Sequence, residues 1–290
     1  MRHGRRALAI ALLLLAGTSC RRPPAGAAAE DPLAGARTLI DEQRFDEAIA
    51  AIGEKGDAEA LYLLGRAWAG KAQAAPVPTP VPGSHGWEPM KPEESQALAF
   101  FERAVAARPD LAAAHLGIAD LLAPHALAAA RGGGAAPGNS TVGRVLESYG
   151  RAIQADPAGT AAVESMIRFA ITAGRVAEAD GAYQELIRRR REDPDLLVRY
   201  GDFLAGPGRN AEGALAQYSQ ALIWRPDDGR TRLKVASIYL AAASALLDQR
   251  EYAAAEARLR DARRFVADPS SPEAARLREM EGRLREIRGR

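Results

Sequence analysis

The chain has 290 residues, of which 47% are hydrophobic and only 6% aromatic, and its formal net charge is +2. Three arginines lie in an N-terminal segment that we expect to be removed, and the rest of the chain carries 36 basic residues against 37 acidic ones. This balance argues against a nucleic-acid-binding protein, which needs a basic surface. Alanine is the dominant apolar residue, which suits closely packed helices better than a β-sandwich. No stretch shows the convincing alternation of apolar and polar residues that is typical of a strand. The sequence therefore predicts an all-α protein.

Residues 1–20 have the features of an export signal. Arg2, Arg5 and Arg6 precede an apolar run, residues 7–16, that is too short to span a bilayer as a stable helix. The only cysteine, Cys20, follows at the end of this run. A single cysteine excludes an intrachain disulfide.

The segment that ends at Cys20 resembles a bacterial lipoprotein signal, although Gly17 stands where that family usually has leucine. The resemblance implies that Cys20 carries lipid after cleavage. Arg21 follows it, and the absence of aspartate there implies an anchor in the outer membrane, facing the periplasm. Residues 21–31 are then a flexible tether. The alternative is ordinary signal cleavage, near Ala27 or Ala29, which would leave the protein secreted or periplasmic.

From residue 32 onward, small and aromatic residues recur on one helical stripe. Ala179, Tyr183 and Leu186 stand at i, i+4 and i+7, and the same spacing returns 35 residues later. A recurrence of this length indicates an array of helical repeats. The residues that fill the repeated second-helix positions are Phe45, Ala48 and Ile52, then Ala97, Phe101 and Ala104, then Val145, Tyr149 and Ala152, then Ala179, Tyr183 and Leu186, then Ala214, Tyr218 and Ala221, and finally Tyr252, Ala255 and Leu259.

The first helices carry a pattern of their own, most clearly Leu61, Leu64, Gly65 and Trp68. Together, these patterns resemble the tetratricopeptide repeat, a pair of antiparallel helices about 34 residues long. The resemblance covers most of residues 32–269. It implies a right-handed α-solenoid of about six helix pairs, whose first helices line a concave groove.

The last segment, residues 271–290, is predicted to be a capping helix. Ser271 and Pro272 form a favourable helix start. A terminal repeat needs such a polar-backed helix to cover its exposed apolar face. The stripe expected to cover that face consists of Leu277, Met280, Leu284 and Ile287.

Two insertions interrupt the repeat period, near residues 74–92 and 123–140. The first is rich in proline and contains Trp87, and the second contains three consecutive glycines, residues 132–134. Each insertion falls between the first and the second helix of its own unit, so we expect both on the same edge of the stack. They are interpreted either as part of a binding surface, with Trp87 as the candidate contact, or as tolerated surface loops.

The stripe opposite the packing positions of the first helices is the candidate binding surface. It mixes charge with modest apolar area, as expected for a groove that takes an extended peptide or a helix of a partner protein. The alternative is that this stripe is merely a solvated face. The groove candidates are Arg37, Tyr62, Arg66, Glu164, Arg168, Val198 and Asp202.

No pattern typical of catalysis or metal binding is found. The histidines, His3, His85, His115 and His125, do not have metal-ligand spacing, and His115 is interpreted as a packing or groove residue. A nucleophile elbow and a phosphate-binding loop are also missing from the sequence. We therefore expect no catalytic residue, no metal, no cofactor, no small-molecule substrate and no nucleic acid.

The predicted function is that of a non-enzymatic scaffold or assembly factor. Tethered by lipid outside the cytoplasmic membrane, it would bind another cell-envelope protein through the groove and the edge loops. Two sharper alternatives rest on resemblance: a pilotin-like assembly factor for a type IV pilus secretin, and a structural component of polysaccharide export. A remote alternative is a metal-binding or enzymatic protein that uses the insertions and His85.

Overall fold

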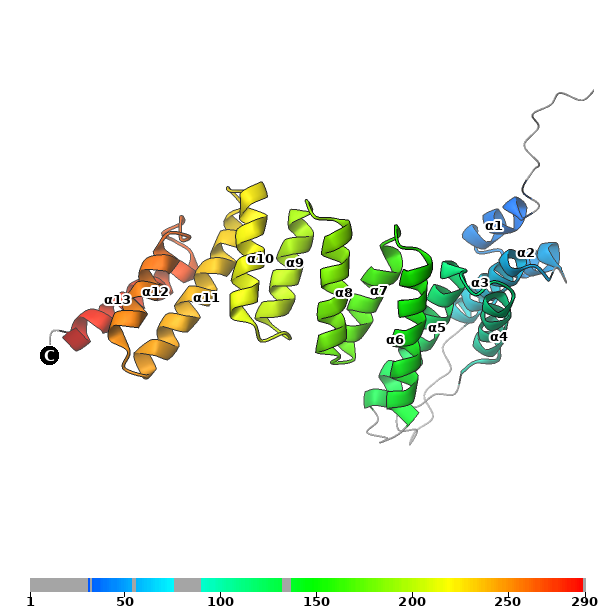
Figure 1. Cartoon of the computed structure of the whole chain (residues 1–290), viewed down its shortest axis with the longest axis horizontal. Helices are drawn as coiled ribbons and strands as arrows, with labels where there is room; N and C mark the ends of the chain where they lie inside the picture. Colours follow the sequence, from blue (N-terminus) through cyan, green and yellow to red (C-terminus); the bar gives the residue numbers. More distant parts are fainter. Residues whose placement is uncertain (1–30, 32, 54–55, 76–89, 132–136, 289–290) are drawn as a thin grey trace, which may run out of the picture.

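A computed structural model describes residues 31, 33–53, 56–75, 90–131 and 137–288, with the backbone alone for residues 137–140. This part of the chain consists of helices joined by short turns and contains no strand (Figure 1). The helices are α1 (Ala34–Asp41), α2 (Phe45–Ile52), α3 (Ala58–Ala74), α4 (Pro92–Ala107), α5 (Ala112–Arg131), α6 (Pro137–Ala155), α7 (Ala161–Thr172), α8 (Val176–Arg189), α9 (Pro194–Ala205), α10 (Ala211–Trp224), α11 (Gly229–Asp248), α12 (Tyr252–Arg263) and α13 (Pro272–Arg288).

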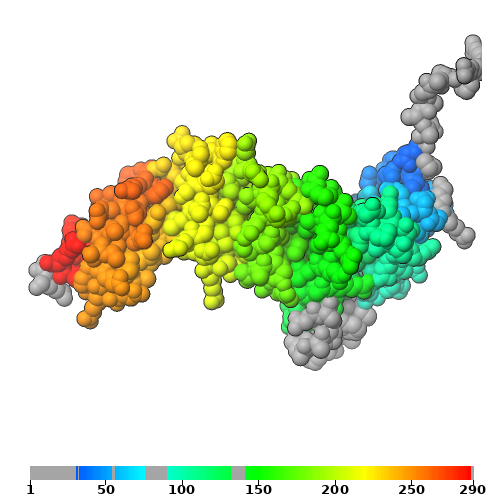
Figure 2. All heavy atoms as spheres, viewed as in Figure 1, coloured from blue at the N-terminus to red at the C-terminus, as the bar shows by residue number. Residues whose placement is uncertain are grey.

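Consecutive helices pack as pairs, and the pairs stack in sequence order. Each odd-numbered helix from α1 to α11 contacts the even-numbered helix that follows it, and each pair contacts the next. The first helices also contact one another from α1 through α3 and α5 to α7. The result is an elongated body in which the colours follow the sequence along the long axis (Figure 2). The predicted solenoid of six helix pairs with a C-terminal helix is confirmed.

The hydrophobic core is divided into clusters that follow one another along the stack. One cluster joins α1, α2 and α3, another joins α4, α5, α6 and α7, and a third extends from α7 to α11. A further cluster joins α11, α12 and α13. A stack of this kind has no single centre, and each unit is stabilised by its neighbours.

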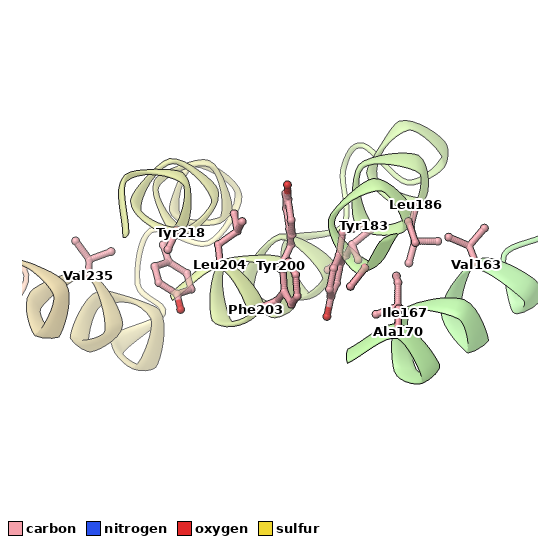
Figure 3. Packing of buried hydrophobic residues seen from close by; sticks show 14 residues of the cluster. Val163, Ile167, Ala170, Tyr183, Leu186, Tyr200, Phe203, Leu204, Tyr218 and Val235 are labelled. Carbon is pink, nitrogen blue, oxygen red and sulfur yellow. The ribbon is translucent and has the colours of Figure 1, made fainter. Parts of the chain in front are cut away.

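Tyr183, Leu186 and Tyr218, which occupy repeated second-helix positions, belong to the third cluster (Figure 3). Ala179, Tyr183 and Leu186 are all buried, and the ring of Tyr183 stacks on Tyr200 with 5.0 Å between centroids. Phe203 lies 5.3 Å from the same ring. Aromatic rings therefore fill the space between the α7–α8 pair and the α9–α10 pair.

Glycines let the second-helix rings approach the first helices closely. A methyl group at Gly65 would lie 2.5 Å from Cδ1 of Phe101, and one at Gly201 would lie 2.5 Å from Cε1 of Tyr218. Phe101 also lies against Gly117 of the next first helix, where a methyl group would be 2.8 Å from the ring. No side chain can be added at these points unless the ring moves.

Four of the described helices, α4, α6, α9 and α13, begin with proline. Helix α8 ends at Arg189, and Pro194 is the first residue of α9. Asp193 caps α9 by accepting a hydrogen bond from the backbone N–H of Leu196 at 3.0 Å. Proline suits the first position of a helix because its missing N–H has no partner to lose there.

The second insertion is largely helical rather than a loop. The expected insertion near 123–140 overlaps the end of α5, which continues to Arg131, and the start of α6, which begins at Pro137. These are long helices of 20 and 19 residues, and α5 contains Pro124 in its interior. His125 on this extension lies 3.2 Å from a carboxylate oxygen of Glu94 at the start of α4. The surplus length thus extends the helix pair and packs on the preceding unit.

The capping helix is confirmed with one exception. Ser271 Oγ accepts a hydrogen bond from the N–H of Ala274 at 3.2 Å, as a helix cap does. Leu277, Met280 and Leu284 are buried against α11 and α12. Ile287 is wrongly assigned to this stripe, because 36% of it is exposed and it does not belong to the buried cluster of α11, α12 and α13.

Several sequence-based interpretations lie outside the described residues. They concern the signal segment with Cys20, most of the tether, and most of the first insertion, including His85 and Trp87. Within the part of the chain that is described, α5 is the one helix long and apolar enough to cross a membrane by length and composition, and 33% of its most apolar window is buried. In the structure α5 packs against α3, α4, α6 and α7.

The contact between Gly65 and Phe101 predicts a large effect from a small substitution. Phe101 is 2% exposed and is held between Gly65 and Gly117, so its ring cannot move away from a new methyl group. We expect Gly65→Ala to lower the free energy of unfolding by about 1–3 kcal/mol, measured by urea denaturation.

Gly181→Ala is the matched control for this substitution. Gly181 lies in α8, where a new methyl group meets no atom within 4 Å. Alanine at such a helical position stabilises by about 0.5–1 kcal/mol. Equal urea midpoints for the two variants would show that the close approach at Gly65 does not constrain the fold.

Candidate protein-binding groove

Two adjoining hollows lie along the first helices. The hollow between α3 and α5 has a volume of about 410 Å³, and the hollow between α5 and α7 has a volume of about 450 Å³. Asp120 of α5 lines both. The two hollows together are called the groove below.

The α3–α5 hollow is formed by one stripe of each helix. Tyr62, Arg66 and Gln73 belong to the α3 stripe, and Leu116 and Leu121 belong to α5. The ring of Tyr62 lies 6.1 Å from that of Phe101, so Tyr62 is both a wall of the hollow and part of the core. Arg66 is ion-paired with Asp41 of α1 at 3.1 Å. This hollow is therefore mainly apolar, and its cation is already neutralised.

The α5–α7 hollow contains more polar groups. The hydroxyl of Tyr149 donates a hydrogen bond to Asp120 Oδ1 at 2.8 Å, and Arg168 donates one to Ser165 Oγ at 2.8 Å. Burial raises the pKa of Tyr149, and the nearby Asp120 carboxylate adds to that effect. Burial by the surrounding atoms also raises the pKa of Asp120, which the Tyr149 hydrogen bond and the charge of Arg168 oppose.

Two predicted groove residues are instead ion-paired within the solenoid, Arg37 with the next helix pair and Glu164 within its own. Arg37 is ion-paired with Asp31 and, at 3.1 Å, with Glu59 of α3. Glu164 is ion-paired at 3.1 Å with Arg190, which follows the end of α8 and also donates to Thr160 Oγ1 at 2.6 Å. Their charges are therefore used within the solenoid.

Val198 and Asp202 lie on α9, outside the two hollows. Val198 is half-buried and packs against the third core cluster. Asp202 accepts a hydrogen bond from Tyr218 at 2.7 Å and is ion-paired with Lys234 of α11. The burial of Tyr218 and that hydrogen bond raise the pKa of its hydroxyl.

Of the seven predicted groove residues, the structure brings together Tyr62, Arg66 and Arg168. The interpretation of these residues as partner contacts remains a prediction. Asp120 was missed, although the sequence contained a signal for it. It stands three residues after Gly117, where the preceding unit has Trp68 three residues after Gly65, so a charged residue occupies an otherwise apolar position.

The histidines within the described residues have structural partners. His115 is 5% exposed, and its Nε2 lies 2.8 Å from the carbonyl oxygen of Pro109. His125 faces Glu94, as described above. In the part of the chain that the structure describes, no three histidine, cysteine or acidic side chains are grouped as a metal site would require.

A further hollow lies on the opposite stripe of α3. It has a volume of about 670 Å³ and is bounded by α2, α3 and α4. Most of its lining residues are apolar, with Trp68 and Phe100 as the largest of these. Arg103 also lines this hollow, and its guanidinium lies 5.3 Å from the centroid of the Phe100 ring, which is part of the same lining.

Comparisons with known proteins give likeness of fold only. No family model and no curated protein matches the chain. TTC0263, a thermophilic tetratricopeptide-repeat protein of Thermus thermophilus, is 19% identical over 71% of this chain and 96% of its own, with a TM-score of 0.41. YrrB, a tetratricopeptide-repeat protein with an unusual peptide-binding site, is 16% identical over 81% and 97%, with a TM-score of 0.44. MamA of Desulfovibrio magneticus RS-1 is 15% identical over 68% and 98%, with a TM-score of 0.43.

Identities below 25% and TM-scores below 0.5 carry no conclusion about the function of this chain. The resemblance to tetratricopeptide repeats is confirmed by the observed helix pairs, with glycines and rings at the expected positions.

Proposed function

We propose that this chain is a non-enzymatic scaffold that binds another protein through the groove. The observation that carries the proposal is the pair of adjoining hollows on three consecutive first helices, each lined by both apolar and polar side chains. An extended peptide or a helix of a partner can place successive side chains in such hollows. The shallow, open shape suits positioning of a partner better than chemistry.

The proposed partner is another protein of the cell envelope. Residues 1–20 have the composition of an export signal, and Cys20 stands where lipoproteins are acylated. Multiple acyl chains on this cysteine would hold the protein stably on a membrane, whereas one chain would bind only reversibly. In this proposal the anchor lies in the outer membrane, and the solenoid faces the periplasm.

A photocrosslinking experiment in intact cells of the native host tests the groove. Benzoylphenylalanine is placed at Gln73 or Thr172, which are exposed side chains that line the α3–α5 and α5–α7 hollows. We expect each to give an adduct with the same envelope protein, identified by mass spectrometry, because both face the proposed partner.

The control for this experiment is Gln220, an exposed residue on the second helix α10. It should give no such adduct. If Gln220 formed an adduct with an envelope protein and neither Gln73 nor Thr172 did, the partner would bind the second helices. That result would contradict the proposal.

A labelling experiment tests the anchor separately. Cells grown with alkyne-palmitate should label the wild-type chain and leave Cys20→Ser unlabelled, because no other cysteine is present to carry lipid. The wild type should also sediment with membranes. An unlabelled wild type recovered in the soluble periplasmic fraction would refute lipid anchoring and leave the groove unaffected.

A further inference from the structure

The hollow bounded by α2, α3 and α4 lies outside the groove and has the size of a small-molecule site. Its volume of about 670 Å³ falls within the range of about 300–1,000 Å³ that is typical of such sites. Two second helices of different length flank it, since α2 has 8 residues and α4 has 16. Gly53, which follows α2, lines the hollow and contributes no side chain. The short helix and this glycine leave room beside α3.

The lining of this hollow combines a buried floor with half-exposed rings. Leu61 and Leu64 of α3 are 3% and 4% exposed. Trp68 of α3 and Phe100 of α4 are only half-buried, as is Ile49 of α2. Apolar surface that is left open to water in one place marks a binding site more often than scattered apolar residues do. An apolar ligand in the hollow would remove this surface from water.

The charge at the hollow is positive. Among the described residues, Arg103 is the only charged side chain in the lining, and no ion pair of it is found. The nearby Lys71, 5.3 Å from the centroid of the Trp68 ring, is neutralised by Asp46 of α2 at 2.6 Å. The guanidinium of Arg103 rests against the Phe100 ring, which leaves its N–H groups able to donate to an anion.

The scarcity of polar groups favours an alkyl chain over a peptide as the occupant. A peptide brings backbone N–H and C=O groups, which cost free energy when they are buried without partners. Gln96 and Arg103 are the only polar side chains that the described residues contribute to the lining. An alkyl chain needs no hydrogen-bond partner along its length.

We infer that the hollow between α2, α3 and α4 binds a fatty acid. The alkyl chain lies over Leu61 and Leu64 and against Trp68, and the carboxylate accepts hydrogen bonds from Arg103. An anionic head group follows from charge complementarity, because the lining carries a cation and no carboxylate. This site lies on the opposite stripe of α3 from the groove, so the inference does not rest on the proposed function.

Calorimetric titration of the full chain with fatty acids of increasing length tests the inference. The protein carries Cys20→Ser, so that no acyl group attached to the chain competes for the hollow. Below the micelle concentration, affinity should rise from octanoate to decanoate to dodecanoate, about fourfold for each methylene group that is buried. An affinity that is independent of chain length, or equal binding of dodecanoate and dodecyltrimethylammonium, would overturn the inference.

Two substitutions assign the binding to this hollow. Arg103→Gln should weaken dodecanoate binding about fivefold, because it removes a charge-assisted hydrogen bond at a partly solvated site. Gln96→Trp should weaken it more strongly, because Gln96 is an exposed residue of α4 that lines the hollow, and a larger side chain fills the space.

The matched controls are Arg276→Gln and Gln220→Trp. Both residues are exposed, on α13 and α10 respectively, and neither lines the hollow. Their substitution should leave the affinity for dodecanoate unchanged. If Arg276→Gln weakened binding as much as Arg103→Gln, general attraction by positive charge would explain the binding and the assigned site would be wrong.

Fluorescence locates the alkyl chain directly. The sequence contains three tryptophans, so Trp87→Phe and Trp224→Phe together leave Trp68 as the only emitter. A dibrominated fatty acid should quench this emission, because bromine quenches an indole that it contacts. Binding without quenching would place the ligand elsewhere and refute the inference. None of these variants alters a residue that lines the groove, so this outcome leaves the proposed function unaffected.

Discussion

The structure depends on the contact between a glycine of a first helix, which has no side chain, and an aromatic ring from a second helix. At Gly65 and Phe101, and again at Gly201 and Tyr218, a single methyl group would collide with the ring. Dense packing of this kind fixes the separation of the two helices within narrow limits. Because Phe101 also contacts Gly117, the same ring sets the position of the next unit.

The rings also connect the core to the groove face. Tyr149 and Tyr218 occupy equivalent second-helix positions, and each donates its hydroxyl to a first-helix carboxylate, Asp120 or Asp202. The aromatic ring of each tyrosine therefore packs in the core, and its hydroxyl group orients a carboxylate on the first helix. Asp202 is also ion-paired with Lys234 of the next first helix, whereas no ion pair of Asp120 is found in the described part of the chain. The cation of the next first helix differs accordingly, since Lys234 pairs with Asp202 and Arg168 donates to Ser165 instead.

The fold could be predicted from the sequence because its determinants are local and repeated. The spacing of Ala179, Tyr183 and Leu186 indicates both the helix and its buried face, and the structure buries all three. The length of α5 and α6 was not predictable in the same way, because glycine-rich residues 132–134 suggested a loop that began earlier. Helical extension was decided instead by packing, including the contact of His125 with Glu94.

The candidate site was predictable only in part. Helical periodicity correctly placed Tyr62, Arg66 and Arg168 on the first-helix surface, as the lining of the two hollows shows. It could not show that Arg37 and Glu164 are paired with residues 22 and 26 positions away, because such pairs depend on how the helices pack against one another. Ion pairing determines which charged side chains remain available to a partner, and the ion pairs can be identified only from the three-dimensional structure.

The most direct test of the central contact is a double-mutant cycle between Gly65→Ala and Phe101→Leu, measured as free energies of unfolding in urea. Leucine is smaller than the ring and leaves room for the methyl group. The cost of Gly65→Ala should therefore fall in the Phe101→Leu background, with a coupling of about 1 kcal/mol or more. Additive costs would show that the ring does not limit the approach of the helices and would contradict this account of the fold.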